Sequence, residues 1–141
     1  MTTAQQNPTS PARAGTPRRI SIVDDDSSIR EALKSLMRSV QFDVEAFASA
    51  EEFLASQRLD DTACLILDVT LPGMSGFELQ NQLNLEQRGI PIVFITAHAD
   101  EASRKRALNG GAVDFLSKPV RREKLFRAIE SAINHRQEHR S

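Results

Sequence analysis

The sequence predicts an α/β domain built on a doubly wound, parallel, five-stranded sheet with helices on both faces. Short apolar runs alternate along the chain with segments whose apolar residues recur at helical spacing. Several of these runs contain no polar residue, which is typical of strands buried on both faces of a parallel sheet. No internal repeat and no second apolar core is evident, so the pattern indicates one domain.

Composition is that of an ordinary globular protein. The chain has 141 residues, of which 40% are hydrophobic, and a formal net charge of -1. Residues 1–17 contain almost no large apolar side chain, so we expect a disordered leader there. We expect the folded domain to span residues 18–136 and the tail, residues 137–141, to fray. Basic residues near the two ends are too sparse to indicate a nucleic-acid surface.

The sequence predicts a cytoplasmic protein. No apolar run is long enough to span a bilayer, and residues 1–17 lack the apolar core of a secretory signal. The single cysteine, Cys64, lies within an apolar run, so we expect a buried, unreactive thiol. One cysteine cannot form a disulfide within the chain, which agrees with a reducing compartment.

The first part of the chain predicts a strand, an acidic corner and an amphipathic helix. Ile20–Val23 is a short strand that runs directly into three aspartates. Asp26 or Ser27 can cap the helix that follows, whose apolar residues form one stripe. Phe42–Phe47 alternates apolar and acidic residues, as a half-exposed edge strand does, and Ser49–Glu52 has the spacing of a capping box for a short helix.

The strand predicted at Ala63–Leu67 is the centre of the domain. It is apolar throughout and is followed by a carboxylate, Asp68. A turn at Pro72 and Gly73, with a second glycine at Gly76, stops the strand and opens a loop. Asp68 should therefore stand at the carboxyl end of the strand, where open α/β sheets bind their ligands.

The last part of the chain predicts two more strands between helices. The expected elements are a helix over Phe77–Arg88 that Gly89 ends, a strand at Ile92–Ile95, a helix over Glu101–Leu108, a strand at Val113–Leu116 and a helix from about Arg121. Asp100 can cap the second of these helices, and a glycine in Asn109–Gly111 can end it in the left-handed conformation.

Polar side chains follow four of the predicted strands. Because parallel strands deliver their carboxyl ends to the same end of a sheet, we expect convergence of Asp24, Asp25, Asp68, Thr96 and Lys118. Three carboxylates this close would not remain ionised without a cation. Mg²⁺, which takes a few protein oxygens and several waters, is the expected occupant.

The same residues predict a site for phosphoryl transfer. The Thr96 hydroxyl can donate to one phosphoryl oxygen, and the Lys118 ammonium can neutralise another. Asp68 is then the nucleophile that takes the phosphoryl group as an acyl phosphate. This chemistry needs no further acid or base from the protein.

Four ordered motifs resemble the receiver domain of bacterial two-component response regulators. They are VDDD at residues 23–26, LDVTLPGMSG at 67–76, FITA at 94–97 and DFLSKP at 114–119. The resemblance covers about residues 18–136, and FITAHAD and GGAVDFLSKP are most similar to the FixJ branch. It implies a flavodoxin-like fold of five βα units with strand order 2-1-3-4-5.

The resemblance also implies a role for each site residue. Asp68 would accept a phosphoryl group from a histidine kinase and would contribute to the metal site. Asp24 and Asp25 would form the acidic pair, with Asp25 a direct Mg²⁺ ligand. Thr70 would offer its backbone carbonyl as another ligand.

Two further positions match the switch of the family. Thr96 and Phe115 match a pair in which phosphate draws the threonine hydroxyl inward and the aromatic ring turns into the vacated space. Lys118 matches the phosphate-binding lysine, and Lys118–Pro119 matches a peptide bond that is cis in the family. Because the switch aromatic is Phe115, no hydroxyl is available to hydrogen-bond when the ring points outward.

These roles imply a phosphorylation-controlled switch that catalyses only its own phosphorylation and dephosphorylation, and not an enzyme of metabolism. We expect a single-domain response regulator, because the chain stops where a FixJ relative continues into a DNA-binding domain. Its partner would be a sensor histidine kinase or a phosphotransfer protein, with no direct contact to nucleic acid or membrane. Phosphate relay, phosphate sequestration and effector binding remain equal alternatives. The receiver half of a FixJ-type transcription regulator is the alternative to a stand-alone protein.

We expect an effector, or a second copy of the chain, to bind through the fourth helix, the fifth strand and the last helix. The basic side chains of this region either line such a surface or form a solvated face. They are Arg104, Lys105, Arg106, Arg121, Arg122, Lys124 and Arg127.

Two other classes of protein fit part of the pattern. A small phosphatase of the haloacid dehalogenase class uses a strand-end aspartate as nucleophile, with a second aspartate two residues later and a threonine and a lysine further along the chain. In this sequence Asp24 and Asp26 match the two aspartates, and Thr96 and Lys118 match the other two residues. That assignment leaves Asp68 without a role. A degenerate receiver acting as a constitutive scaffold usually lacks one site residue, and none is missing here. The aspartate that becomes phosphorylated distinguishes these classes.

Overall fold

A computed structural model of the chain describes residues 18–140. The predicted disordered leader, residues 1–17, lies outside this range, as does residue 141 at the end of the predicted tail. Five parallel strands form one sheet in the order β3-β2-β4-β5-β6. Their bounds are β2 Arg19–Val23, β3 Asp43–Phe47, β4 Thr62–Asp68, β5 Ile92–Thr96 and β6 Asp114–Ser117. In chain order this is 2-1-3-4-5, so the predicted fold is confirmed.

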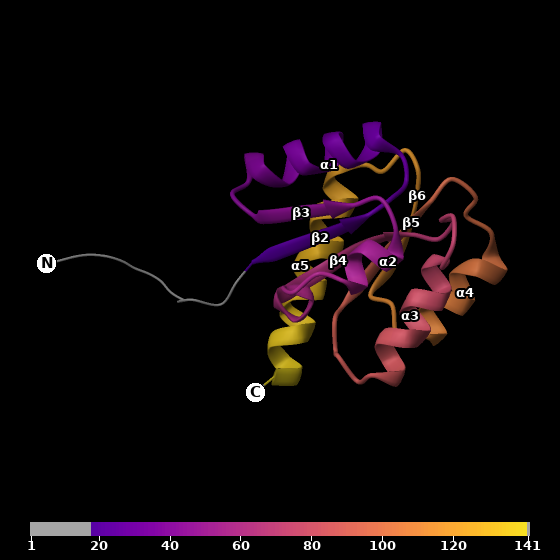
Figure 1. Ribbon diagram of the computed structural model, residues 1–141. Helices are drawn as coiled ribbons and strands as arrows, with labels where there is room; N and C mark the ends of the chain where they lie inside the picture. The colour runs from indigo at the N-terminus through magenta and orange to yellow at the C-terminus, as the bar shows by residue number, and fades with distance from the viewer. Residues whose placement is uncertain (1–17, 141) are drawn as a thin grey trace, which may run out of the picture.

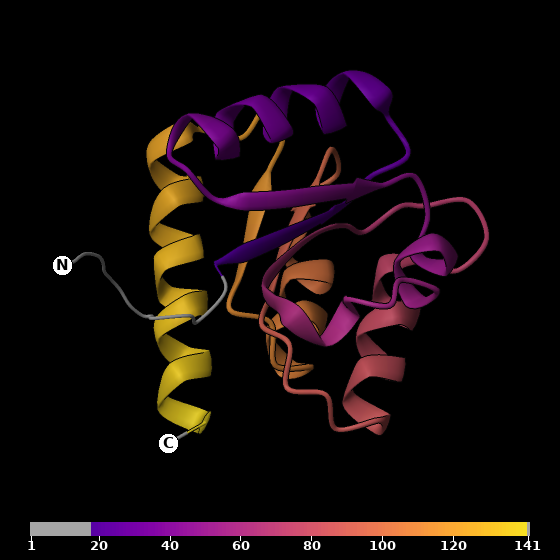
Figure 2. The ribbon, with the colours of Figure 1, turned by 60° about the vertical axis from the view of Figure 1, so that its left-hand side comes forward.

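Helices cover both faces of the sheet. They are α1 Ser27–Ser39, α2 Ala50–Leu54, α3 Gly76–Leu85, α4 Glu101–Asn109 and α5 Arg122–Arg140. Figures 1 and 2 show α1 and α5 on one face, and α2, α3 and α4 on the other. The core is accordingly split into two apolar layers, one around Met37 and Ile129 and one around Phe53 and Leu79. Within residues 18–140, no helix combines the length and hydrophobicity needed to cross a bilayer.

The central strand β4 determines where the chemistry lies. All seven of its residues are buried, because β2 and β5 flank it and helices cover both of its faces. Val23 at the end of β2 is in register with Leu67. The next residues, Asp24 and Asp68, therefore emerge together at the end where the strands finish, which we call the carboxyl end of the sheet.

Side-chain caps start α1, α2, α3 and α4, and those of α1, α2 and α4 were predicted from the sequence. The Asp26 carboxylate, and not Ser27, caps α1 by accepting from the N–H groups of Ser28 and Ile29. Ser49 and Asp100 cap α2 and α4 as predicted. A further capping box, with Ser75 and Glu78 bonded reciprocally, starts α3, so this Ser-x-x-Glu spacing is a signal that the sequence prediction did not use.

The predicted end of the third helix was wrong. It ends at Leu85 and not at Arg88, because Gln87 adopts a left-handed conformation (φ 56°) and the Arg88 N–H bonds back to the Leu83 carbonyl. Leu85, the last residue of α3, is 76% exposed although it is apolar. Residues two apart lie about 200° apart around a helix, so Leu85 faces solvent when Leu83 faces the sheet.

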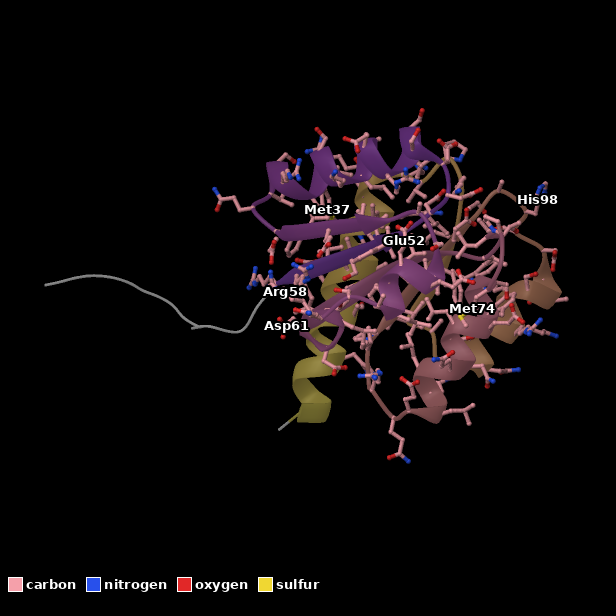
Figure 3. The ribbon with its side chains drawn as sticks, in the orientation of Figure 1. Met37, Glu52, Arg58, Asp61, Met74 and His98 are labelled. Atoms are coloured by element: carbon pink, nitrogen blue, oxygen red, sulfur yellow. The ribbon has the colours of Figure 1, made fainter. Side chains whose placement is uncertain are left out.

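The opposite, amino end of the sheet carries its own ion pairs. The Arg19 guanidinium, buried at the start of β2, contacts the carboxylates of Asp43 and Glu45 on the neighbouring strand. Arg58 pairs with Asp43 and with Asp61, and Figure 3 shows Arg58 and Asp61 beside each other. These contacts balance charge near the surface.

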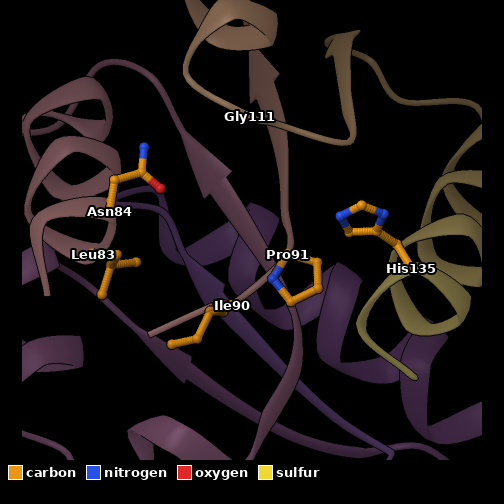
Figure 4. Close-up of a pocket in the computed structure, with 7 residues that line it drawn as sticks. Leu83, Asn84, Ile90, Pro91, Gly111 and His135 are labelled. Carbon is orange, nitrogen blue, oxygen red and sulfur yellow. The ribbon is translucent and has the colours of Figure 1, made fainter. Parts of the chain in front are cut away.

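A pocket of about 200 Å³ also opens at the amino end (Figure 4). Its lining comes from four parts of the chain. They are Leu83 and Asn84 of α3, the Gly89–Pro91 segment that leads into β5, Gly111 between α4 and β6, and His135 of α5. The predicted phosphoryl site is at the other end of the strands, so this pocket is separate from it.

Candidate functional site

Asp24 forms the buried half of an acidic corner after β2. Its backbone N–H bonds to the Phe47 carbonyl at 3.1 Å, which extends the pairing of β2 with β3 by one residue. The side chain is fully buried, and its Oδ1 accepts from the Asp26 N–H at 2.8 Å. Its Oδ2 is also buried, and the ammonium of Lys118 lies 2.8 Å from it. A buried carboxylate oxygen requires such a cationic partner.

Asp68 lies beside it at the end of β4 and is almost completely buried. Its Oδ1 accepts from the Thr70 N–H at 3.2 Å, and its Oδ2 accepts from Lys118 Nζ at 2.9 Å. Gly76 makes this arrangement possible, because a Cβ at that position would lie 2.3 Å from the Asp68 carbonyl oxygen. Gly76 is therefore required because its backbone lies against the Asp68 carbonyl, and not because of a left-handed turn.

Lys118 joins the two carboxylates. Besides its bond to Asp68, its Nζ forms an ion pair with Asp24 Oδ2 at 2.8 Å. Burial alone would lower the pKa of the Lys118 ammonium, but its contacts with Asp24 and Asp68 outweigh burial and raise the pKa. Burial is also the main cause that raises the pKa of Asp68, against the opposing hydrogen bond from Lys118. The peptide bond between Lys118 and Pro119 is cis.

The three predicted acidic residues meet at one point. One carboxylate oxygen from each of Asp24, Asp25 and Asp68 lies within 4.8 Å of the others. Carboxylate oxygens are the ligands that hard divalent cations such as Mg²⁺ prefer, so the chemistry of the donor set fits such an ion. Asp25 is exposed whereas the other two are buried, which leaves one side of the cluster open to water.

Of the two predicted switch residues, Thr96 lies on the strand next to Asp68 and Phe115 lies on the strand beyond it. Thr96 ends β5, is buried, and its Oγ1 accepts from the His98 N–H at 3.1 Å. Its carbonyl accepts from the Lys118 N–H at 2.8 Å, which links the switch threonine to the lysine through the backbone. The Phe115 ring is buried, with its centroid 6.4 Å from that of Phe94.

Arg30 supports the acidic corner and was missed by the sequence reasoning. Its Nη1 donates to the Asp24 carbonyl at 2.8 Å from one turn inside α1. An arginine on the polar side of a predicted helix has no periodic signal that distinguishes it from a solvated one. Only the fold shows that it reaches back over the helix start to the strand end.

Comparisons with known proteins agree with this geometry. The response regulator receiver domain family matches residues 20–130, which is most of the chain. Nodulation protein W of Bradyrhizobium diazoefficiens is 49% identical over 119 residues, covering 84% of this chain and 52% of that protein. The chain spans about half the length of the curated relatives it matches.

Solved structures show the same fold. The response regulator StyR superposes with a TM-score of 0.80 at 47% identity, covering 86% of this chain and 62% of that one. The structure titled FixJ-N superposes with a TM-score of 0.75 at 36% identity, covering 83% of this chain and 94% of that one. Two further relatives are named as regulators, the response regulator protein TodT of Pseudomonas putida and the transcriptional regulatory protein FixJ of Bradyrhizobium diazoefficiens. The chain therefore belongs to the receiver domain family of two-component response regulators.

Proposed function

We propose that Asp68 accepts a phosphoryl group from a sensor histidine kinase or phosphotransfer protein, and that the phosphorylated domain presents a changed surface. The observation that carries this proposal is the burial of Asp24 and Asp68 around one ammonium, Lys118. Two buried carboxylates that share one ammonium cost free energy to keep ionised. Such an arrangement is characteristic of a functional site.

Four groups would hold Mg²⁺ in this proposal. They are the carboxylates of Asp24, Asp25 and Asp68, together with the Thr70 backbone carbonyl that the family resemblance implies. When bound, Mg²⁺ neutralises charge on the phosphoryl oxygens during transfer. The open side that Asp25 leaves toward solvent gives a phosphate access to the cluster.

The chain's own residues perform the remaining steps. A carboxylate oxygen of Asp68 bonds to phosphorus while the bond between phosphorus and the donor's imidazole nitrogen breaks. The freed imidazole recovers a proton from water. Lys118 already contacts Asp68, so its ammonium is in place to neutralise the added charge, and the Thr96 hydroxyl can donate to a phosphoryl oxygen. Water hydrolyses the acyl phosphate slowly and returns the domain to its first state.

Thr96 and Phe115 would carry the change to the surface. Drawing the Thr96 hydroxyl toward phosphate breaks its bond with the His98 N–H and alters the packing beside Phe115. Phosphorylation thus shifts the population between two arrangements of the α4 and β6 region. An effector or a second copy would bind there. The same switch serves a stand-alone receiver or the receiver of a longer transcription regulator.

The direct test is the intact mass of the protein after incubation with acetyl phosphate, with and without Mg²⁺. We expect one phosphoryl group, dependent on Mg²⁺, in the wild type and none in Asp68→Asn. Asp61→Asn, at the amino end of the sheet, is the control and should be phosphorylated like the wild type. An adduct that survives Asp68→Asn would point to Asp24 and the phosphatase class, and no adduct in any variant would support a scaffold.

A further inference from the structure

A side chain from α2 holds the loop that follows the phosphoacceptor strand. We call residues 69–75, between β4 and α3, the acceptor loop. Glu51 Oε2 accepts a hydrogen bond from the Met74 N–H at 2.8 Å, across 23 residues of sequence. This bond is the main cause that lowers the pKa of Glu51, so its carboxylate is ionised throughout the neutral range.

The acceptor loop is shaped to receive this carboxylate. Gly73, next to Met74, has a left-handed conformation (φ +75°), and a Cβ there would lie 2.7 Å from Glu51 Oε2. A side chain at position 73 would therefore displace Glu51 as well as strain the backbone. Figure 3 shows Met74 at the end of this loop, close to where α3 begins.

The other end of the same loop touches Asp68. The Thr70 N–H donates to Asp68 Oδ1 at 3.2 Å, and the Gly76 N–H closes the loop onto the Val69 carbonyl at 3.0 Å. The loop is thus anchored at its base by these bonds and near its end by the bond from Met74 to Glu51. Loss of the Glu51 anchor would allow the loop, including Thr70, to sample other conformations.

We propose that Glu51 is a positioning residue for the phosphoacceptor site, holding the acceptor loop so that Thr70 keeps its place beside Asp68. This inference rests on the proposed function. If Asp68 accepts a phosphoryl group with Mg²⁺, a loop that keeps Thr70 in place holds the site ready for both. Glu51 does not belong to the cluster of Asp24, Asp25 and Asp68, and its carboxylate bonds to the Met74 N–H. Its effect must therefore pass through Met74 and the loop.

The chain supplies a matched control in the neighbouring residue. Glu52 is also an exposed glutamate of α2, but its Oε1 accepts from the Ala48 N–H at 3.0 Å and supports the start of its own helix. Glu52→Ala removes one negative charge and one hydrogen bond without touching the loop. Glu51→Gln keeps an oxygen acceptor for Met74 while removing the charge, so it separates the hydrogen bond from electrostatics.

The experiment compares the wild type with Glu51→Ala, Glu51→Gln and Glu52→Ala in the full chain. Amide hydrogen exchange of Met74 and Thr70 is measured without Mg²⁺, and the Mg²⁺ dissociation constant is obtained from backbone amide shifts during titration with MgCl₂. For Glu51→Ala we expect faster exchange at both amides and Mg²⁺ binding weakened about three- to tenfold. We expect Glu51→Gln and Glu52→Ala to stay within about twofold of the wild type.

Three outcomes would overturn the inference while leaving the proposed function intact. The first is unchanged exchange at Met74 and unchanged Mg²⁺ affinity in Glu51→Ala. The second is an equal loss of affinity in Glu52→Ala, which would assign the effect to charge or to the stability of α2. The third is Glu51→Gln behaving as Glu51→Ala does, which would exclude the hydrogen bond as the cause. If the wild type itself binds no Mg²⁺, the proposed function fails and the inference fails with it.

Discussion

The two ends of the sheet both bring a cation against carboxylates, yet they differ in which partner is buried. At the amino end the Arg19 side chain is 3% exposed, while its partners Asp43 and Glu45 are 51% and 48% exposed. At the carboxyl end the carboxylates of Asp24 and Asp68 are 0% and 7% exposed, around Lys118 at 16%. Water can therefore solvate Asp43 and Glu45 at the amino end, whereas it reaches little of Asp24 and Asp68 at the carboxyl end.

This difference separates a structural ion pair from a binding site. Half-exposed carboxylates around a buried guanidinium leave no charge unbalanced in the interior. Two buried carboxylates around one ammonium, with Asp25 beside them, leave an excess of negative charge that a further cation would neutralise. Substitutions at the amino end should therefore change stability, and substitutions at the carboxyl end should change Mg²⁺ binding and phosphorylation.

The largest effect is expected for Asp24→Asn. Loss of this ligand should slow phosphorylation by acetyl phosphate about a hundredfold and weaken Mg²⁺ binding by a similar factor. Without Mg²⁺, the free energy of unfolding should change by less than about 1 kcal/mol, because lost repulsion from Asp68 offsets the lost ion pair with Lys118. Phosphorylation kinetics and urea unfolding measure the two quantities. A strong loss of stability would show that Asp24 is structural.

The next largest effect is expected for Gly76→Ala at the carboxyl end. The new Cβ would meet the Asp68 carbonyl oxygen at 2.3 Å, so the backbone must shift, at a cost of about 2 kcal/mol, and phosphorylation should fall with it. Gly89→Ala at the amino end is the control. Gly89 has a left-handed φ of +67° but open space around it, so only strain of about 1 kcal/mol applies. Urea unfolding and phosphorylation of both variants test this difference, and equal phosphorylation would contradict it.

A smaller effect is expected for Arg19→Met. Methionine keeps most of the buried stem while removing the charge, and the exposed Asp43 and Glu45 can be solvated by water. The free energy of unfolding should fall by about 1 kcal/mol, with no change in the rate of phosphorylation. Thermal unfolding and the acetyl phosphate assay measure the two effects. A slower phosphorylation at equal folded fraction would show that the two ends of the sheet are coupled.

The smallest effect concerns Cys64, which lies in β4 between the two ends. Burial raises the pKa of its thiol to about 12, so the folded protein keeps a proton that the unfolded chain loses at about 8.5. The unfolded state then binds fewer protons, and stability falls as pH rises past 8.5. Between pH 7 and pH 9 this loss should reach about 0.8 kcal/mol. It should be absent from the pH dependence of Cys64→Ala, and an equal dependence in that variant would contradict the assignment.

Elements with a repeating pattern were predictable, whereas elements without one were not. The apolar runs predict each strand to within one residue at either end. Asp26, Ser49 and Asp100 start helices because a short polar side chain can accept from free N–H groups. The end of α3 was misplaced, because the backbone leaves the helix at Gln87, before the glycine that marks it in sequence. The 3₁₀ turn at Leu59–Asp61 was not predicted, because three residues carry no period.

By itself, the sequence determined which chemical groups meet at the carboxyl end of the sheet. Asp24, Asp68 and Thr96 follow or end strands, and parallel pairing brings such residues together whatever the details of packing. Only the tertiary structure decided how each oxygen is used. Lys118 between two carboxylates, Arg30 on the Asp24 carbonyl and Glu51 on the Met74 N–H join residues from different elements. Such contacts depend on distances and angles that only the packed chain sets, so no local pattern encodes them.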